Sequence, residues 1–279
     1  GSKQTIMPIK AGEILNGYRL IEPIADGGMG SVWKAKHPNL ERLVAIKFIK
    51  PELLSADTVR QLFLEEARHL SQLRSPQVVQ VLDSGLTESQ APFMVTEYLP
   101  GVDLSTHLEA YGALPAEAVC RIGIDVLKAL SEAHAMGIIH GDLKPSNIFL
   151  MDVQGQKQPV VKVLDFGVAC LMEDGRDEES TLGSRIVRGS LQYMSPEQVT
   201  LGNLTPASDM YTFGAMLYRL LTNQCVFLGE SQEQIRQKLS EIAPLISANM
   251  SKGHCPGALE DLVRTCLERL PENRPSSAQ

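Results

Sequence analysis

The segment from Ile138 to Leu150 constrains the fold of this chain most, because it holds polar residues between two apolar runs. An isoleucine pair precedes the polar residues, and Ile148-Phe149-Leu150 follows them. Apolar runs of this kind are usually buried, so both flanks are expected to anchor a short, rigid loop. Such a loop would aim the side chains of Asp142, Lys144 and Asn147 at one point.

These three side chains supply the groups that phosphoryl transfer requires. A carboxylate can accept the proton of a hydroxyl group, an ammonium offsets phosphate charge, and an amide oxygen can hold a metal ion. A single loop does not establish a reaction, so the interpretation depends on the rest of the chain.

The composition restricts which other functions are open. The 279 residues can bury a sizeable core in one large domain or two lobes, and 43% hydrophobic residues is typical of a globular protein. A formal charge of −7 and a pI near 5.5 argue against general nucleic-acid binding and against a cationic membrane-binding surface. Phosphate chemistry would therefore depend on a few local lysines and arginines.

The five cysteines are odd in number, widely spaced and without a Cys-x-x-Cys pair, so reduced thiols are expected rather than disulfides or a zinc site. There is no secretory signal, and the most apolar segment, 210–228, is expected to be a buried core helix. A cytoplasmic domain is expected.

Gly1-Ser2 resembles a remnant of an expression tag, and residues 275–279 begin what reads as another helix. The chain is therefore expected to be a fragment of a longer protein, which could be membrane-anchored elsewhere.

The pattern of apolar residues changes near Leu99-Pro100-Gly101. Before this point alternation predicts strands, together with one helix over 57–73, and beyond it helices dominate. Gly137 has the place of a capping glycine after a helix, and the polar residues 170–190 are expected to form an exposed loop. Strands are predicted over 18–24, 31–36, 43–49, 78–82, 92–98, 147–151 and 160–164, and further helices over 116–136, 209–222, 231–241 and 257–269.

A glycine-rich turn, Ala25–Val32, lies between the first two predicted strands. Glycines let such a turn fold closely over phosphates, so that backbone N–H groups reach them; a plain hairpin turn is the alternative. The turn is not a Walker P-loop, because no Gly-Lys-Ser/Thr follows it. A dinucleotide fingerprint is disfavoured, since a strand rather than a helix comes next.

Two charged residues stand beside apolar runs. Lys47 lies within the predicted strand 43–49, where a buried ammonium would need a partner such as Glu65 or Glu66. A lysine that snorkels from an edge strand is the alternative. Asp165 follows the predicted strand 160–164 and precedes Phe166-Gly167, which suits a metal ligand at a tight turn.

Together these motifs resemble the signature set of protein kinases. The glycine-rich turn, Val-Ala-Ile-Lys, the helix glutamate, His-x-Asp-Leu-Lys-Pro-x-Asn, Asp-Phe-Gly and Ser195-Pro196-Glu197 follow the family's order between about Tyr18 and Pro275. The Gly-Gly-Met-Gly turn and Tyr193–Gln198 are similar to bacterial, eukaryotic-like (Hanks-type) Ser/Thr kinases. The resemblance implies an α+β, bilobal kinase fold. It has an N-terminal extension (1–17), a nucleotide-binding N-lobe with an antiparallel sheet and one main helix (18–98), and a mainly helical C-lobe (99–279), truncated at its last helix.

The resemblance implies a role for each matching residue. Asp142 would be the catalytic base, Lys144 would contact the γ-phosphate of ATP, and Asn147 and Asp165 would hold Mg²⁺ or Mn²⁺. Lys47 would bind the α- and β-phosphates and pair with Glu66. The hinge from Glu97 to Leu99 would bind adenine through its backbone, with Thr96 as gatekeeper. The remaining nucleotide contacts would come from Ile24, Gly27, Gly28, Gly30, Val32, Ala45 and Phe149.

Other residues would support this site. Asp209 would brace the catalytic loop, Glu197 would pair with Arg274, and His140 would pack beneath the Asp-Phe-Gly turn. His134, near the end of a long helix, is expected to serve core packing.

Two residues depart from the family pattern. Ala25 takes the place of the first glycine of the turn, which implies a modest effect on nucleotide binding. Gly141 replaces the arginine of His-Arg-Asp, which normally gathers a phosphorylated activation-loop residue. We therefore expect activity not to depend on phosphorylation of the loop through that arginine, although Arg185 and Arg188 could substitute for it. The loop hydroxyls concerned are Ser180, Thr181 and Ser184.

Three functions remain open: a Ser/Thr protein kinase, a small-molecule phosphotransferase, and a catalytically weak pseudokinase that acts as a scaffold. His-Gly-Asp also resembles aminoglycoside- and choline-type kinases, but these generally lack Lys144-Pro145 and the segment 189–197. A pseudokinase usually lacks a lysine, aspartate or asparagine of the signature set, and none is missing here. The protein kinase is favoured. The implied partners are ATP and proteins with Ser/Thr hydroxyls, without nucleic acid, and back-to-back or front-to-front homodimers are expected from the family.

Overall fold

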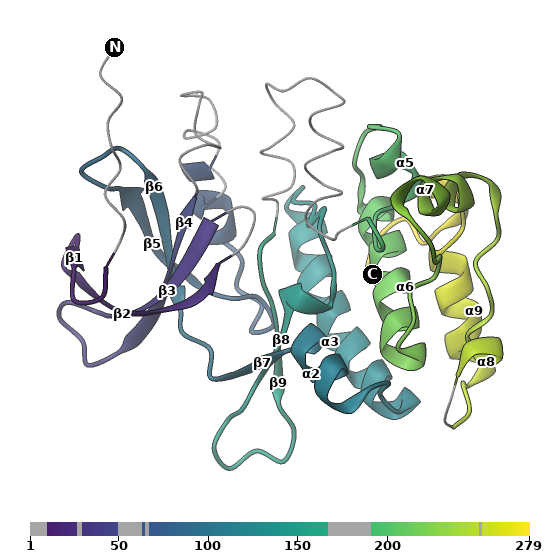
Figure 1. Cartoon of the computed structure of the whole chain (residues 1–279), viewed down its shortest axis with the longest axis horizontal. Helices are drawn as coiled ribbons and strands as arrows, with labels where there is room; N and C mark the ends of the chain where they lie inside the picture. The colour runs from purple at the N-terminus through teal and green to yellow at the C-terminus, as the bar shows by residue number, and fades with distance from the viewer. Residues whose placement is uncertain (1–9, 27–29, 50–62, 65–66, 167–190, 251–252) are drawn as a thin grey trace. The chain divides into compact units, whose positions relative to one another are not determined.

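The computed structural model describes residues 10–26, 30–49, 63–64, 67–166, 191–250 and 253–279. The chain divides into two compact units (Figure 1). The first comprises the residues up to Arg74 together with Val79–Pro100, and the second comprises Ser75–Val78 and Gly101–Gln279. Among the described residues, no helix is both long and apolar enough to cross a membrane.

The first unit is built on a six-stranded sheet in the order β1-β2-β3-β4-β6-β5, in which all neighbouring strands pair antiparallel. Two register shifts interrupt the pairing of β2 with β3, one of them between Pro23 and Ala25. Such irregularities bend and twist a strand. The strands are β1 Ile14–Leu15, β2 Tyr18–Asp26, β3 Gly30–Lys36, β4 Leu43–Ile49, β5 Val81–Leu86 and β6 Pro92–Glu97.

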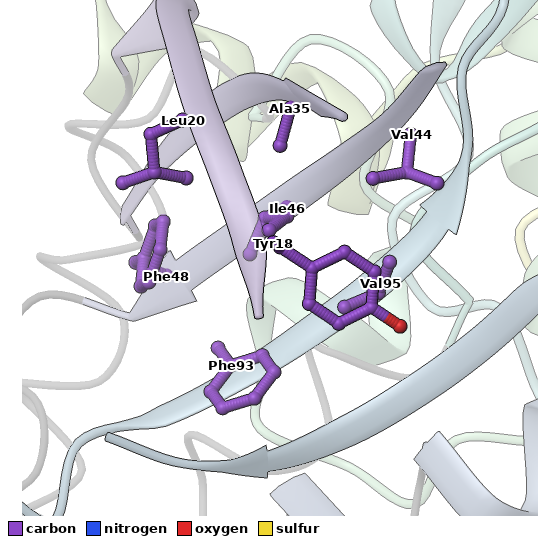
Figure 2. Packing of buried hydrophobic residues seen from close by; sticks show 8 residues of the cluster. All are labelled: Tyr18, Leu20, Ala35, Val44, Ile46, Phe48, Phe93 and Val95. Atoms are coloured by element: carbon purple, nitrogen blue, oxygen red, sulfur yellow. The ribbon is translucent and has the colours of Figure 1, made fainter. Parts of the chain in front are cut away.

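One face of this sheet carries the core of the first unit (Figure 2). Val44, Ile46 and Phe48 of β4 are buried, whereas the two residues between them are only partly buried. Successive side chains of a strand point to opposite faces, so Ala45 and Lys47 lie on the other face. The core cluster consists of Tyr18, Leu20, Ala35, Val44, Ile46, Phe48, Phe93 and Val95, with Leu15 and Trp33 packed against it.

The second unit is mainly helical and also contains a three-stranded antiparallel sheet in the order β7-β8-β9. Its strands are β7 Gly101–Asp103, β8 Ile148–Met151 and β9 Val160–Val163. Its helices are α2 Leu104–Tyr111, α3 Ala116–Ala135, α5 Pro196–Val199, α6 Pro206–Thr222, α7 Ser231–Ser240, α8 Ile246–Asn249 and α9 Gly257–Cys266, with short 3-10 turns η2 Pro145–Asn147 and η4 Pro271–Asn273.

Helix α6 forms the core of the second unit. It packs against α3, α8 and α9, and from Ala207 to Thr222 every residue except Arg219 is buried. A helix that is buried on all sides belongs to a protein core, which confirms the prediction of a core helix in this segment. The packing is close at Gly214, where a Cβ atom would lie 2.6 Å from the Cβ atom of Cys266 in α9.

Helix α3 ends at the predicted glycine. Gly137 has a φ of 74°, a conformation that glycine adopts without strain. Its N–H donates to the carbonyl oxygen of His134 at 3.0 Å, and the N–H of Ile138 donates to that of Ala133 at 2.8 Å. These bonds satisfy carbonyl groups at the helix end, as expected for such a cap.

Some elements differ from the sequence-based expectation. The strand expected over 78–82 begins only at Val81, because Val78 forms a bridge with Val163 in the second unit. Strands β1 and β7 are too short for alternation to predict them. Helix α2 was also missed; it begins after Asp103, whose carboxylate accepts hydrogen bonds from two backbone N–H groups of its first turn. Of the helix expected over 57–73, residues 63–64 and 67–70 are helical and residues 71–73 are not, and the others lie outside the described residues, as does the whole loop expected over 170–190.

Candidate active site

One buried carboxylate, that of Asp209, holds the expected catalytic loop of the second unit. Its Oδ2 accepts a hydrogen bond from the backbone N–H of His140, and its Oδ1 accepts one from that of Gly141, both at 2.8 Å. Oδ2 also accepts from Nε2 of His134 at 2.8 Å. Asp209 lies in the first turn of α6, where the helix dipole favours negative charge. The predicted bracing of the loop by Asp209 is confirmed.

The ring of His140 ties the loop to the segment that carries Asp165. Its Nε2 lies 2.8 Å from the carbonyl oxygen of Leu164, and its Nδ1 accepts from the N–H of Asp142 at 3.2 Å. Because a carbonyl oxygen can only accept, the ring carries its proton on Nε2. The buried ring of Phe166 packs against it with 4.7 Å between the ring centroids. The predicted packing of His140 is confirmed for Phe166, whereas Gly167 of the Asp-Phe-Gly turn lies outside the described residues.

The structure brings Asp142, Lys144 and Asn147 together. The Nζ atom of Lys144 lies 2.7 Å from Oδ2 of Asp142, and these side chains are 16% and 23% exposed. The Nδ2 atom of Asn147 donates to the backbone oxygen of Asp142 at 2.7 Å. An amide that donates through its nitrogen keeps its oxygen as an acceptor for another partner. The loop therefore presents a solvent-accessible carboxylate and ammonium next to a fixed amide.

Asp165 has a strained backbone with a φ of 56°, which residues other than glycine rarely adopt. Strain of this kind concentrates at functional sites. The residue before it, Leu164, donates its N–H to the carbonyl oxygen of Asn147 at 2.8 Å. The segments that contain Asn147 and Asp165 are thus joined through their backbones. Phe149 lies two residues after Asn147, in β8, and is partly buried.

Asn147 and Asp165 offer oxygen donors of the kind that Mg²⁺ prefers. Mg²⁺ is usually held by one or two protein oxygens together with substrate phosphates and water, rather than by a complete protein cage. The donor set therefore fits this ion. Within the described ranges, no group of three or more His, Cys, Asp or Glu side chains is arranged to hold a metal.

In the first unit, the sheet face opposite the core carries several residues expected to bind nucleotide. Val32 of β3 lies opposite Lys47 of β4, and Ala45 lies opposite Thr96 of β6. Directly opposed residues share a face, so these four side chains are neighbours. Lys47 also pairs with Met94 of β6, the other neighbour of β4. Met94 therefore lies on the same sheet face as Lys47, and it is buried.

Lys47 lies in the interior of this sheet, because β4 is flanked by β3 and β6. The alternative of an edge-strand lysine is therefore wrong. The side chain is partly rather than fully buried, since it occupies the face away from the core. Its expected partner Glu66 lies outside the described residues.

Close backbone contact requires glycine at position 30. A Cβ atom there would lie 1.7 Å from the carbonyl oxygen of Phe48 on the neighbouring strand. Ala25 pairs with Val32 across the turn, and Ile24 is 48% exposed. Gly27 and Gly28 lie outside the described residues.

The expected hinge is attached to the sheet through Glu97. Its backbone N–H donates to the carbonyl oxygen of Gln80, and its Oε1 accepts from the N–H of Gln80, both at 3.0 Å. The hydroxyl of Thr96 donates to the carbonyl oxygen of Glu97 at 3.3 Å. Leu99 follows in a partly buried position.

The predicted ion pair of Glu197 with Arg274 is confirmed and is bidentate. The Nη1 and Nη2 atoms lie 2.7 and 3.0 Å from Oε1 and Oε2, and the arginine side chain is fully buried. The guanidinium also donates to three backbone carbonyl groups. Burial alone would raise the pKa of Glu197, but hydrogen bonds from Arg274 and Ser208 hold it below its usual value.

Sequence reasoning missed three features of the site. The first is Met94, and the second is the hydrogen bond from His134 to Asp209. The third is Gln198, whose Nε2 donates to the carbonyl oxygen of Gly141 at 2.6 Å. The Ser-x-x-Gln spacing from Ser195 predicts a capping box at the start of α5. It does not predict the contact of Gln198 with Gly141, which lies 57 residues away in the sequence. The activation-loop residues Ser180, Thr181, Ser184, Arg185 and Arg188 lie outside the described residues.

Bacterial serine/threonine-protein kinases are among the sequence relatives of this chain. The family model for the protein kinase domain matches residues 18–279. Serine/threonine-protein kinase pkn3 of Myxococcus xanthus is 36% identical over 263 residues, which are 94% of this chain and 48% of that protein. Serine/threonine-protein kinase PknB of Mycobacterium leprae is 32% identical over 264 residues, which are 94% of this chain and 41% of that protein. The chain thus spans about half or less of the length of these relatives.

Solved structures show the same fold. The kinase domain of Mycobacterium tuberculosis PknI matches with a TM-score of 0.74 at 21% identity, over 97% of this chain and 95% of that one. Rad53 in complex with AMP-PNP matches with a TM-score of 0.71 at 26% identity, over 94% of this chain and 63% of that one. The fold, the match over nearly the whole chain and the order of its motifs show that this chain belongs to the protein kinase domain family.

Proposed function

We propose that this chain is the catalytic domain of a Ser/Thr protein kinase that transfers the γ-phosphoryl group of ATP to protein hydroxyls. The observation that carries the proposal is the convergence of Asp142, Lys144 and Asn147 in one braced loop, with 2.7 Å between the carboxylate and the ammonium. The relatives named above as serine/threonine-protein kinases support the same reaction.

The residues of the loop have separate tasks in this proposal. The carboxylate of Asp142 orients the substrate hydroxyl and accepts its proton. The ammonium of Lys144, beside that carboxylate, offsets the negative charge of the phosphoryl group during transfer. Asp209 and His140 hold the backbone that positions both groups.

ATP is the proposed donor, with Mg²⁺ (or Mn²⁺) held by Asn147 and Asp165. When bound, the metal ion neutralises phosphate charge. Lys47 would contact the α- and β-phosphates, and Val32 and Ala45 on the same sheet face would contact the base. The backbone from Glu97 to Leu99 would bind the edge of adenine.

The catalytic loop is proposed to work without the family's arginine before the aspartate. Gly141 is buried with a φ of 73° and has no side chain to reach a phosphorylated residue. Activity should therefore survive when Ser180, Thr181 and Ser184 are all replaced by Ala. A folded triple variant without activity would refute this part of the proposal.

The test of the reaction is transfer of label from γ-labelled ATP with Mg²⁺, to the protein itself and to a generic basic protein. The label should appear on Ser or Thr, and Asp142→Asn should reduce the rate by at least about 100-fold, since the base is lost. Asp152→Asn is the matched control, because Asp152 is an exposed aspartate just after β8. Transfer that persists in Asp142→Asn would contradict the assignment.

The two alternatives predict other outcomes of the same assay. A scaffold would bind ATP without transferring label to any protein. A small-molecule phosphotransferase would leave proteins unlabelled but consume ATP when offered an amino sugar or an amino alcohol.

A further inference from the structure

A buried glutamine touches the peptide group that precedes the proposed catalytic base. Gln198 belongs to α5 and is 2% exposed. Its Nε2 donates to the carbonyl oxygen of Gly141 at 2.6 Å, and its Oε1 accepts from the N–H of Ser195 at 2.9 Å. The amide therefore connects two segments that are far apart in the sequence.

The other end of the same peptide group is also held. The N–H of Asp142 donates to Nδ1 of His140 at 3.2 Å. Because the peptide unit is planar, a bond at its C=O and a bond at its N–H together fix its orientation. That orientation determines where the Cα–Cβ bond of Asp142 can point.

Glycine makes such a restraint necessary at this position. Gly141 has a φ of 73°, and without a Cβ atom its backbone samples many conformations at low cost. Its N–H is held by Asp209 at 2.8 Å, but that bond acts on the preceding peptide group. A hydrogen bond to the carbonyl oxygen is what selects one orientation of the peptide group that leads into Asp142.

We propose that Gln198 is a positioning residue for Asp142: it fixes the Gly141–Asp142 peptide group and couples the segment Ser195–Val199 to the catalytic loop. This inference rests on the proposed kinase function. In the sequence, the coupled segment follows the loop expected over 170–190. Leu191 and Met194 pack with Val199 in one buried cluster, which helps to fix the position of this segment. Through Gln198, the position of the segment then affects the orientation of the Asp142 carboxylate.

Two substitutions separate positioning from structural support. Gln198→Met keeps the length of the side chain but removes the donor to Gly141. Gln198→Glu keeps an oxygen for the N–H of Ser195, and its carboxyl group can donate to Gly141 only when it is protonated. Burial raises the pKa of a carboxyl group, so protonation should occur on mild acidification.

We expect kcat to fall about 10- to 100-fold in both variants at pH 8, because small displacements of a reacting group are costly. The KM for ATP should change less than about twofold. On lowering the pH from 8 to 6, Gln198→Glu should regain activity relative to wild type, whereas Gln198→Met should not. Gln156→Glu, an exposed position outside the site, is the control for added charge and should match wild type at every pH.

A purely structural role would lower the thermal midpoint of both variants without a selective loss of kcat and without recovery of Gln198→Glu at low pH. Wild-type kcat in Gln198→Met, or parallel pH profiles of Gln198→Glu and wild type, would overturn the positioning role alone. An inactive wild-type protein would overturn the kinase proposal, and this inference with it.

Discussion

Asp209 illustrates how one residue can organise a site without taking part in its chemistry. Its two oxygens accept hydrogen bonds from the backbone of His140 and Gly141 and from the ring of His134. Hydrogen bonds to a charged acceptor are worth more than neutral ones, and their loss inside a core leaves donors without a partner. The conformation of the proposed catalytic loop therefore depends on a side chain nearly seventy residues away.

Gly30 is a second residue at which one atom decides the local structure. We expect Gly30→Ala to destabilise the protein by about 2 kcal/mol or more, because the new Cβ atom would overlap the carbonyl oxygen of Phe48 at 1.7 Å. The measurement is the free energy of unfolding in urea. Gly257→Ala is the control: nothing lies within 4 Å of the place that its new methyl group would take, and alanine favours the first turn of α9. Equal stability of the two variants would contradict the prediction.

At the scale of elements, Arg274 and Lys238 are two buried cations of the second unit that are held in different ways. Arg274, next to η4, donates to a carboxylate and to three carbonyl groups, so its charge is well compensated. Lys238 of α7 donates to the carbonyl oxygen of Gln192 at 3.2 Å and lies over the rings of Tyr211 and Phe227. Burial lowers the pKa of Lys238 to about 7, although the ring faces favour the ammonium.

This pKa makes stability depend on pH in a defined direction. From about pH 7 to pH 10.5 the unfolded chain keeps the lysine proton while the folded chain releases it, so stability rises with pH. At 1.36 kcal/mol per pKa unit, the rise between pH 7 and pH 9 is on the order of 2 kcal/mol. We expect the free energy of unfolding of Lys238→Met to equal or exceed that of wild type at pH 7. At pH 9, the difference in favour of Lys238→Met should be smaller by about 2 kcal/mol.

Urea unfolding at the two pH values measures this effect. Lys128→Met is the matched control, because Lys128 is exposed and paired with Asp125 at the surface. A stability difference between wild type and Lys238→Met that is the same at both pH values would show that the lysine stays charged in the fold.

At the scale of the whole molecule, binding of ATP and Mg²⁺ would stabilise the folded chain, with Lys47, Asn147 and Asp165 as the proposed binding residues. A ligand that binds only the folded protein stabilises it by about 2.7 kcal/mol at 100 times its Kd. For a chain of this size, that corresponds to a thermal midpoint raised by roughly 5 °C.

We expect Mg²⁺ and a non-hydrolysable ATP analogue to give this shift in wild type and in Asp142→Asn, which keeps the binding residues. Lys47→Met should lose most of the shift, and so should wild type when EDTA removes the metal. Lys36→Met serves as control, since Lys36 pairs with Glu41 at the surface. A full shift in Lys47→Met would remove this lysine from the proposed ATP site.

Much of the fold can be predicted from the sequence where the signal is local. Apolar runs and alternation predict β2, β3, β4 and β6, each of which contributes residues to the core of the first unit. Helical periodicity predicts α3, and a long apolar segment predicts the buried helix α6. Short elements such as β1 and β7 are not predicted, because two or three residues cannot show a period. The strand expected at Val78 is displaced because that residue pairs with Val163, far along the chain.

The order of the motifs, and with it the chemistry proposed for Asp142, Lys144 and Asn147, follows from the sequence alone. How that loop is held depends on the folded chain: Asp209 accepts hydrogen bonds from the N–H groups of His140 and Gly141, and Gln198 and His140 bind the peptide group between Gly141 and Asp142. The physical reason is that residue type limits which bonds a side chain can make, whereas partner, distance and burial are set by folding. Gly141 is an example of both. The sequence reveals that this glycine replaces an arginine, and only the fold reveals which side chains hold its backbone.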